Sequence, residues 1–424
     1  MNSKLRFKIG NTDMYLRQNI SRNYLFMFLY NLDLTRGIWM IYLASRGMSL
    51  TQLGLLETIF HLTSFTMEVP TGAVADLFGR KTSRVVGRLF SLISVCMLFA
   101  FNHFWGYALS FIFSALSYNL ESGAGDALVY DSLKVIGEEE QYMRINGLKE
   151  LFYQLSSILS FFVGGYLATK SYQAAFYLTM GIGIVTILQS TTFVEPHCQS
   201  GAMKAEESTD AHQLEAGNLE ETNILKSAYL IFKNQLFESI AVVRSNRRIA
   251  FLIIFGQMIG TFCTCIFYYN QNFLKSLMYS EFQIGIVLAV SSFSAAIIST
   301  QVHRIESFLK ERRLLFWLPW VTVICIWGIV LSSMHYLFFI VMMMAESVSY
   351  VALTDYINRL IPSEYRATIL SFASMVFSFF MIVMFPLVGV LADVYSIRSS
   401  FMALGGFGIL FVMLNGYFLS KQGA

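Results

Sequence analysis

Acidic, basic and imidazole side chains recur at helical spacing inside otherwise apolar stretches of this sequence. In "NLDLTRG", Asp33 and Arg36 are three residues apart, so on a helix they share a face and can pair. In "LLETIFHLTSFTMEVP", Glu57 and His61 are four residues apart, and Glu68 lies seven beyond His61, nearly in line with them. Because histidine titrates near neutral pH, this stripe predicts a path for protons. For Glu57 a place at the membrane interface is an equal alternative, and Glu68 is also a candidate for gating or capping.

Further polar side chains extend this set. The other ionisable members are Arg88, Glu121, Asp126 and Glu346. The candidates for substrate binding in the second half are Gln257, Tyr268, Asn270 and Gln271. Asp33, Arg36, Glu121 and Asp126 are expected near the middle of their apolar segments. The sequence leaves open whether Arg36 pairs with Asp33 or with Glu121.

The segments that carry these residues are long and apolar enough to cross a membrane. Apolar residues make up 55% of the 424 and charged residues 13%, against about a quarter charged in soluble proteins. A membrane helix needs about 20 mostly apolar residues. Twelve runs meet this length: 24–44, 50–73, 83–102, 106–131, 146–168, 172–194, 248–273, 281–302, 314–333, 336–358, 367–391 and 398–420. They lack the alternation of a membrane barrel, so we predict an all-α membrane protein with twelve transmembrane helices.

The runs fall into two sets of six around a polar interval. We predict an N-terminal segment over 1–23, a first bundle over 24–194, a linker over 195–247 and a second bundle over 248–420. Of the 30 Lys and Arg residues, 24 lie on the side of the termini and 4 on the other side. Both termini are therefore expected in the cytoplasm.

The predicted linker has two parts. Residues 197–222 are acidic and lack periodicity, which is typical of a flexible segment. Residues 223–246 place apolar residues at helical spacing among lysines, which predicts an amphipathic helix. This helix either lies on the inner membrane surface or packs under the bundle.

The sequence also excludes several classes of protein. No nucleophile–base pair or metal-ligand cluster is recognisable, so we expect neither an enzyme nor a metal or cofactor site. Cys263 and Cys265 lack the partners of a metal site. The net charge of +3 is too small and too scattered to indicate nucleic-acid binding.

An internal repeat relates the two halves. "YDSLKVIGEEEQYMRINGL" from Tyr130 matches "TDYINRLIPSEYRATIL" from Thr354, and "GGYLATKSYQAAF" from Gly164 matches "VGVLADVYSIRSSF" from Val388. Two halves of the same topology are what a transporter needs to rock around a central site.

The connection after the second run, "GAVADLFGRK", resembles the cytoplasmic loop signature of the major facilitator superfamily. The matching residues are Gly72, Asp76, Gly79, Arg80 and Lys81, while Leu77 replaces the usual basic residue. Gly79 would permit a tight reversal, and Gly72 would remove bulk where two helices approach closely. Asp76 would accept hydrogen bonds from a helix N-terminus and from a nearby arginine.

The resemblance implies two pseudo-symmetric six-helix bundles that work by alternating access, with this loop latching them on the cytoplasmic side. It further implies proton-driven export of amphipathic small molecules or drugs through a cell (inner or plasma) membrane, without a cofactor. Asn119 stands where proton-dependent relatives carry an arginine in the fourth helix, and the fifth helix lacks their Gly-Pro signature. The expected partners are the substrate, protons and membrane lipid, and a monomer is expected.

Two alternatives remain open from the sequence. The chain could import its substrate, or move a metabolite, peptide or lipid-linked compound on the same fold. A membrane receptor or regulator that no longer transports is the alternative of another class.

Overall fold

The computed structural model describes residues 3–196, 246–361 and 366–421, and within these ranges it contains helices and no strand. The first half comprises α1 (Ser3–Asn31), α2 (Trp39–Ser45), α3 (Leu50–Phe78), α4 (Arg80–Ala100), α5 (Phe104–Ile136), the short 3-10 helix η1 (Glu139–Gln141), α6 (Tyr142–Lys170) and α7 (Tyr172–Thr191). The second half comprises α9 (Arg247–Ser276), α10 (Glu281–Ser299), α11 (Val302–Leu331), α12 (His335–Leu360), α13 (Arg366–Val394) and α14 (Ile397–Lys421). The predicted amphipathic helix lies, up to residue 245, outside the described residues.

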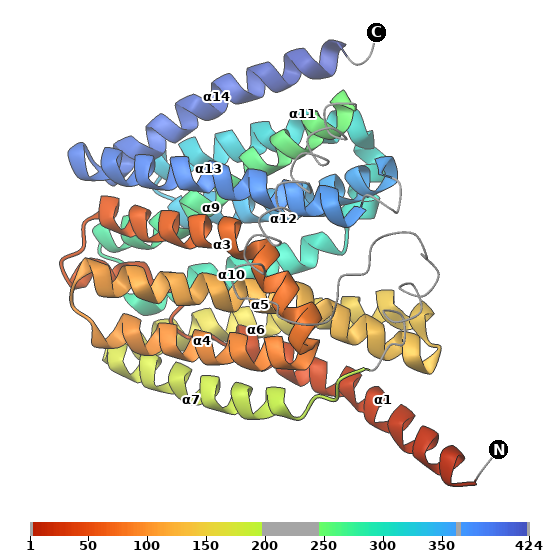
Figure 1. Ribbon diagram of the computed structural model, residues 1–424. Helices are drawn as coiled ribbons and strands as arrows, with labels where there is room; N and C mark the ends of the chain where they lie inside the picture. The colour runs from red at the N-terminus through yellow and green to blue at the C-terminus, as the bar shows by residue number, and fades with distance from the viewer. Residues whose placement is uncertain (1–2, 197–245, 362–365, 422–424) are drawn as a thin grey trace, which may run out of the picture.

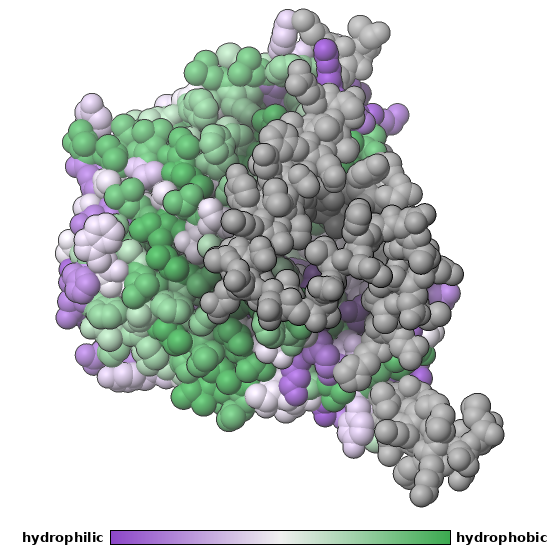
Figure 2. All heavy atoms as spheres, in the orientation of Figure 1, coloured by the Kyte–Doolittle hydropathy of each residue, from purple (hydrophilic) through white to green (hydrophobic). Residues whose placement is uncertain are grey.

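The helix order follows the twelve predicted runs, with α1 and α2 together forming the first. Among the described residues, nine helices are long and apolar enough to cross a membrane by length and composition. Three runs remain: the first is formed by α1 together with α2, the second by α3 and the third by α5. They carry most of the ionisable residues singled out above. Figure 2 shows the corresponding surface, on which apolar side chains cover a broad band between the two ends of the bundle.

The two halves pack side by side, as Figure 1 shows, with the first half below and the second half above. α3 lies against α13, and α6 lies against α10. α1 begins and α14 ends on the same side, which we call the termini side. The opposite side, where α2 is followed by α3, is called the far side. α3 bends in its second half, where Pro70 interrupts the helical hydrogen bonds.

The first predicted run is not one continuous helix. Residues 32–38 leave the helical path between α1 and α2. Neighbouring helices supply hydrogen bonds to the backbone at the break. Ser160 on α6 donates to the carbonyl of Asn31 (3.2 Å), and Thr179 on α7 accepts from the N–H of Leu34 (3.2 Å). Irregular backbone at membrane depth is therefore stabilised by protein side chains.

A second internal repeat becomes visible on the far side. α3 and α10 both begin with Ser-x-x-Gln-x-Gly, and in both helices the serine and the glutamine form a capping box. The glycines of the two motifs, Gly54 and Gly285, each face the other half. A Cβ on Gly54 would lie 2.9 Å from the carbonyl oxygen of Phe385, and Gly285 packs against Gly165. The two halves are thus in close contact along a far-side seam, formed by α3 with α13 and by α6 with α10.

Candidate functional site

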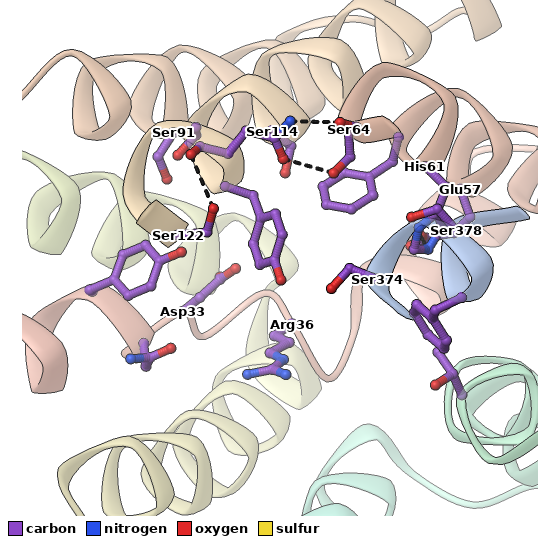
Figure 3. Close-up of a pocket in the computed structure, with 18 of the residues that line it drawn as sticks. Asp33, Arg36, Glu57, His61, Ser64, Ser91, Ser114, Ser122, Ser374 and Ser378 are labelled. Atoms are coloured by element: carbon purple, nitrogen blue, oxygen red, sulfur yellow. Dashed lines mark hydrogen bonds and ion pairs between the residues drawn. The ribbon is translucent and has the colours of Figure 1, made fainter. Parts of the chain in front are cut away.

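A cavity of about 1220 Å³ lies between the two halves (Figure 3). The first half lines it with the α1–α2 break and with residues of α3, α4, α5 and α7. The second half lines it with residues of α9, α12 and α13. Both halves therefore contribute to one central site.

Hydroxyl groups and aromatic rings dominate the lining. The serines are Ser64, Ser91, Ser94, Ser110, Ser114, Ser117, Ser122, Ser349, Ser371, Ser374 and Ser378. The aromatic residues are Tyr30, Trp39, Phe60, Phe111, Tyr118, Tyr268, Tyr350 and Phe377. The lining is therefore amphipathic, with hydrogen-bonding groups beside apolar surface.

The predicted stripe on α3 faces this cavity. Glu57 and His61 line it, with 3.9 Å between a carboxylate oxygen of Glu57 and Nε2 of His61. Glu68 also lines it and accepts a hydrogen bond of 2.8 Å from the hydroxyl of Ser371 on α13. Glu346 on α12 faces the same space from the second half. Carboxyl groups from both halves thus meet one cavity.

The α1–α2 break brings Asp33 and Arg36 to the cavity, but they do not pair with each other. Asp33 Oδ1 accepts hydrogen bonds from the hydroxyl (2.6 Å) and the N–H (2.8 Å) of Thr35. Arg36 Nη2 donates to the hydroxyl of Tyr153 on α6 (3.2 Å). Figure 3 shows both side chains at the cavity, Arg36 without a dashed line to a carboxylate. Arg36 was expected to pair with Asp33 or with Glu121, and in the structure it pairs with neither.

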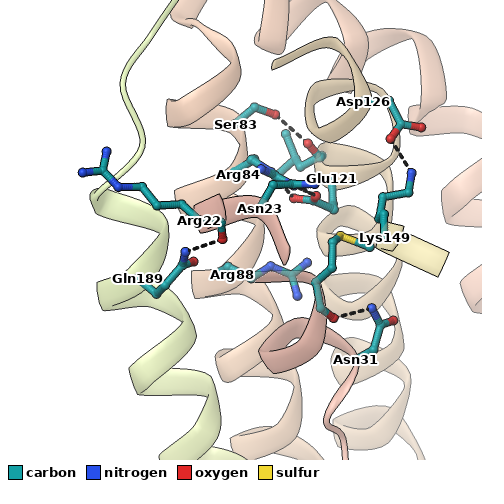
Figure 4. Close-up of polar contacts among 12 residues, drawn as sticks. Arg22, Asn23, Asn31, Ser83, Arg84, Arg88, Glu121, Asp126, Lys149 and Gln189 are labelled. Atoms are coloured by element: carbon teal, nitrogen blue, oxygen red, sulfur yellow. Dashed lines mark hydrogen bonds and ion pairs between the residues drawn. The ribbon is translucent and has the colours of Figure 1, made fainter. Parts of the chain in front are cut away.

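Glu121 pairs instead with Arg84 on α4, a residue outside the predicted site. Arg84 Nη2 lies 2.7 Å from Glu121 Oε1 and also donates to the side chain of Asn23 on α1 (Figure 4). The exposed fractions of Arg84 and Glu121 are 1% and 6%, and neither residue lines the cavity. The available signal was the spacing of Arg80, Arg84 and Arg88, which puts three guanidinium groups on one face of α4.

Two other predicted residues of the first half line the cavity. Arg88 is buried on α4 and donates from Nη2 to the hydroxyl of Ser117 (3.0 Å). Asp126 is exposed, lies nearer the termini side than Glu121, and pairs with Lys149 of α6 at 2.5 Å (Figure 4).

The predicted residues of the second half separate into two groups. Gln257 and Tyr268 on α9 line the cavity, and the Tyr268 ring lies 5.7 Å from the ring of Trp39. Asn270 and Gln271 do not line it, since they are 1% and 0% exposed on α9 near the far side. Their amide groups have no hydrogen-bond partner among the described residues.

The predicted gating loop makes its tight reversal at Gly79, whose φ is 95°. Here α3 ends and α4 begins, and the carboxylate of Glu195 accepts hydrogen bonds from the N–H groups of Arg80 (2.6 Å) and Lys81 (2.9 Å). Glu195 therefore caps the N-terminus of α4, a role that sequence reasoning had not assigned.

Asp76 pairs with Arg80 on the next helix at 2.7 Å, in agreement with its expected arginine contact. The N-terminus of α4 bonds to Glu195 rather than to Asp76. Gly72 was expected where two helices approach closely. This expectation is wrong for this conformation, because a Cβ at that position would meet no atom within 4 Å.

Comparisons with known proteins agree with this architecture. A family model described as Major Facilitator Superfamily matches residues 24–271 and 250–422. The uncharacterised MFS-type transporter YxaM of Bacillus subtilis is 24% identical over 392 residues, which is 89% of this chain and 90% of that protein. The quinolone resistance protein NorA of Staphylococcus aureus is 23% identical over 170 residues, or 40% of this chain and 43% of that protein.

Solved transporters share the fold at low identity. The nucleoside transporter NupG superposes with a TM-score of 0.71 at 13% identity, covering 96% of this chain and 98% of that chain. A bacterial homologue of the human lysosomal transporter Spinster, in an inward-facing and unoccupied conformation, gives a TM-score of 0.70 at 14% identity, covering 96% and 98%. The predicted fold is confirmed by these similarities.

Proposed function

Because the chain belongs to the Major Facilitator Superfamily, we propose that it exports amphipathic small molecules across the cell membrane in exchange for protons. That it is a multi-pass membrane transporter follows from the family and from its apolar helices. The export direction, the proton coupling and the substrate class are our proposal. The similarity to NorA, a protein named for quinolone resistance, supports export of drug-like molecules.

The observation that carries the proposal is the amphipathic cavity between the two halves, which carboxyl groups face from both sides. Glu57 with His61 on α3 and Glu346 on α12 line it. Ionisable groups at membrane depth are costly unless they face water or a partner, so their position in the cavity favours a functional role. If protonation and substrate binding compete for this space, each favours a different facing state of the transporter.

The distribution of basic residues supports a cytoplasmic location for the termini side. The two halves are in close contact along the far-side seam, so the described conformation is interpreted as closed toward the outside. Substrate would enter the cavity from the cytoplasm or the inner leaflet and leave after the seam opens. In this proposal the proton gradient drives alternating access, and no cofactor is needed.

Transport measurements in proteoliposomes test the proposal. Vesicles preloaded with a fluorescent amphipathic drug are given an inward-directed proton gradient. Drug efflux together with proton influx is expected, and Glu57→Gln is expected to abolish the acceleration by the gradient. Glu311→Gln, on the termini side of α11, is the matched control and should behave as wild type. Efflux without proton movement would contradict antiport, and no efflux of any drug in a broad panel would contradict drug export.

The hydroxyl-rich lining favours a second candidate, transport of a polar metabolite. Among the described residues, eleven serines line the cavity, and a polar metabolite would use more of their hydroxyl groups than an amphipathic drug with a large apolar part. The same vesicles distinguish the two candidates if polar solutes replace the drugs. Accumulation of a polar solute with protons moving in the same direction would favour uptake.

A further inference from the structure

Among the described residues, two guanidinium groups that line the cavity form no ion pair. Arg36 lies in the α1–α2 break and contacts Tyr153, a neutral hydroxyl group. Arg88 contacts Ser117 through Nη2, and its guanidinium lies 3.8 Å from the ring centre of Tyr30. Within the described ranges, neither arginine forms an ion pair with a carboxylate.

Arg88 differs in this respect from its neighbour on the same helix face. Arg84 is buried against Glu121, which neutralises its charge through three hydrogen bonds. Arg88 is only 4% exposed, and its Nε has no hydrogen-bond partner among the described residues. A buried charge without a counter-charge is strongly unfavourable, and a hydroxyl and an aromatic face offset only part of that cost.

Four of the five described carboxyl groups that line the cavity lie on other elements than the two arginines. Glu57 and Glu68 belong to α3, Asp126 to α5 and Glu346 to α12, whereas Arg88 is on α4 and Arg36 on the α1–α2 break. Asp33, on the same break as Arg36, already accepts two hydrogen bonds from Thr35. The side of the cavity formed by the break and α4 is therefore the one suited to a negative group.

We propose that Arg36 and Arg88 bind the carboxylate of an amphipathic substrate inside this cavity. A guanidinium presents a planar fork of donors that matches a carboxylate, so it binds such a group more strongly than a neutral one. The hydroxyl and aromatic lining would accommodate the rest of the molecule. The proposal rests on the proposed transport function for the physiological role of this ligand, but the binding can be measured independently of transport.

Fluorescein and its methyl ester are the probes, because they differ only in the carboxylate. Binding to the purified full-length chain in detergent is followed by fluorescence anisotropy, with protein-free micelles subtracted. We expect fluorescein to bind at least about tenfold more tightly than the ester. Arg36→Gln and Arg88→Gln should each reduce fluorescein affinity about tenfold and leave the ester unchanged. Arg88→Lys keeps the charge but not the planar fork, so its fluorescein affinity should lie between those of wild type and Arg88→Gln, which separates loss of the site from misfolding. Arg248→Gln, an exposed ion-pair residue of the termini side, is the matched control.

Equal binding of the two probes to wild type would overturn the proposal, as would equal weakening of both probes in the glutamine variants. Benzoate competition identifies a carboxylate site and should displace fluorescein, whereas benzamide should not. Displacement by phosphatidylglycerol but not by benzoate would assign the site to a lipid headgroup and would also overturn it. If the fluorescein preference holds while proteoliposomes show no proton-coupled export, the proposed function fails and the anion site stands. If export is observed but the two probes bind alike, only the anion site fails.

Discussion

The carboxylate of Asp393, at the end of α13, accepts hydrogen bonds from the backbone N–H groups of Thr51 (2.7 Å) and Leu50 (3.0 Å) at the start of α3. These are two of the N–H groups that a helix leaves without an internal partner. The capping box of Ser49 serves the N–H of Gln52, so Asp393 completes the capping of α3 from the other half of the molecule. The far-side seam is thus joined by charge-assisted hydrogen bonds to the main chain.

Replacing Asp393 by alanine is expected to weaken the closed far side. Hydrogen bonds to a charged group contribute about 1.5–3 kcal/mol each, so their loss should shift the closed-to-open ratio at least about tenfold. Spin labels at Trp105 and Tyr395, both exposed on the far side, report the opening as a longer distance in pulsed electron paramagnetic resonance. Asp355→Asn, which removes an ion pair within α12, should leave the distance distribution unchanged.

Gly54→Val is expected to oppose closure of the same seam by steric overlap. A Cβ at Gly54 would lie 2.7 Å from the hydroxyl of Tyr269 and 2.9 Å from Cα of Pro386. The variant should populate the open far side in the same distance measurement and should slow transport. Gly181→Val is the control, because a Cβ there meets no atom within 4 Å. An unchanged distance distribution in Gly54→Val would mean that this contact does not limit closure.

The buried pair of Arg84 and Glu121 should behave as one unit. Glu121→Gln leaves the Arg84 charge uncompensated, and breaking a buried pair from one side costs about 3–5 kcal/mol. Unfolding of the purified chain should therefore move to markedly lower temperature. The double variant Arg84→Met/Glu121→Met removes both charges and should recover part of the loss. The single variants Arg84→Met and Glu121→Met complete the comparison. A loss of stability in the double variant equal to the sum of their two losses would contradict the coupling.

Asp76→Asn is expected to leave membrane insertion intact and to reduce transport sharply. In this conformation Asp76 pairs with Arg80, and the proposed latch acts when the loop meets the second half in the other facing state. The measurement is drug efflux at matched protein levels. Leu77→Ala, a change in the exposed neighbour, provides the control. Normal efflux by well-expressed Asp76→Asn would contradict the latch role.

The helices were predictable because a long apolar run in lipid satisfies its backbone hydrogen bonds by forming a helix. Their grouping into two bundles was predictable from the polar interval between two sets of six runs. The placement of Glu57, His61 and Glu68 along one face of α3 could also be predicted, since helical periodicity determines it. Their role in proton movement stays a prediction.

Other features depend on tertiary contacts that periodicity does not contain. The α1–α2 break depends on Thr179 and Ser160, which are remote in sequence. Arg84 lies near the start of α4, where basic residues usually face the cytoplasm, and the spacing of the arginines does not identify Asn23 and Glu121 as its partners. Asn270 and Gln271 were predicted to bind substrate because of their polar side chains, but their amides belong to the interior of the second half.

A contact between a side chain and main-chain N–H groups has an asymmetric mutational signature. At Leu50 and Thr51 every substitution except proline retains the donor, so the sequence there can drift while the contact persists. At position 393 only a short acidic side chain supplies the same acceptor. In a laboratory selection for altered substrate turnover, substitutions that open the far side should therefore accumulate at position 393. Substitutions at positions 50 and 51 should rarely be selected, because they leave the N–H donors in place.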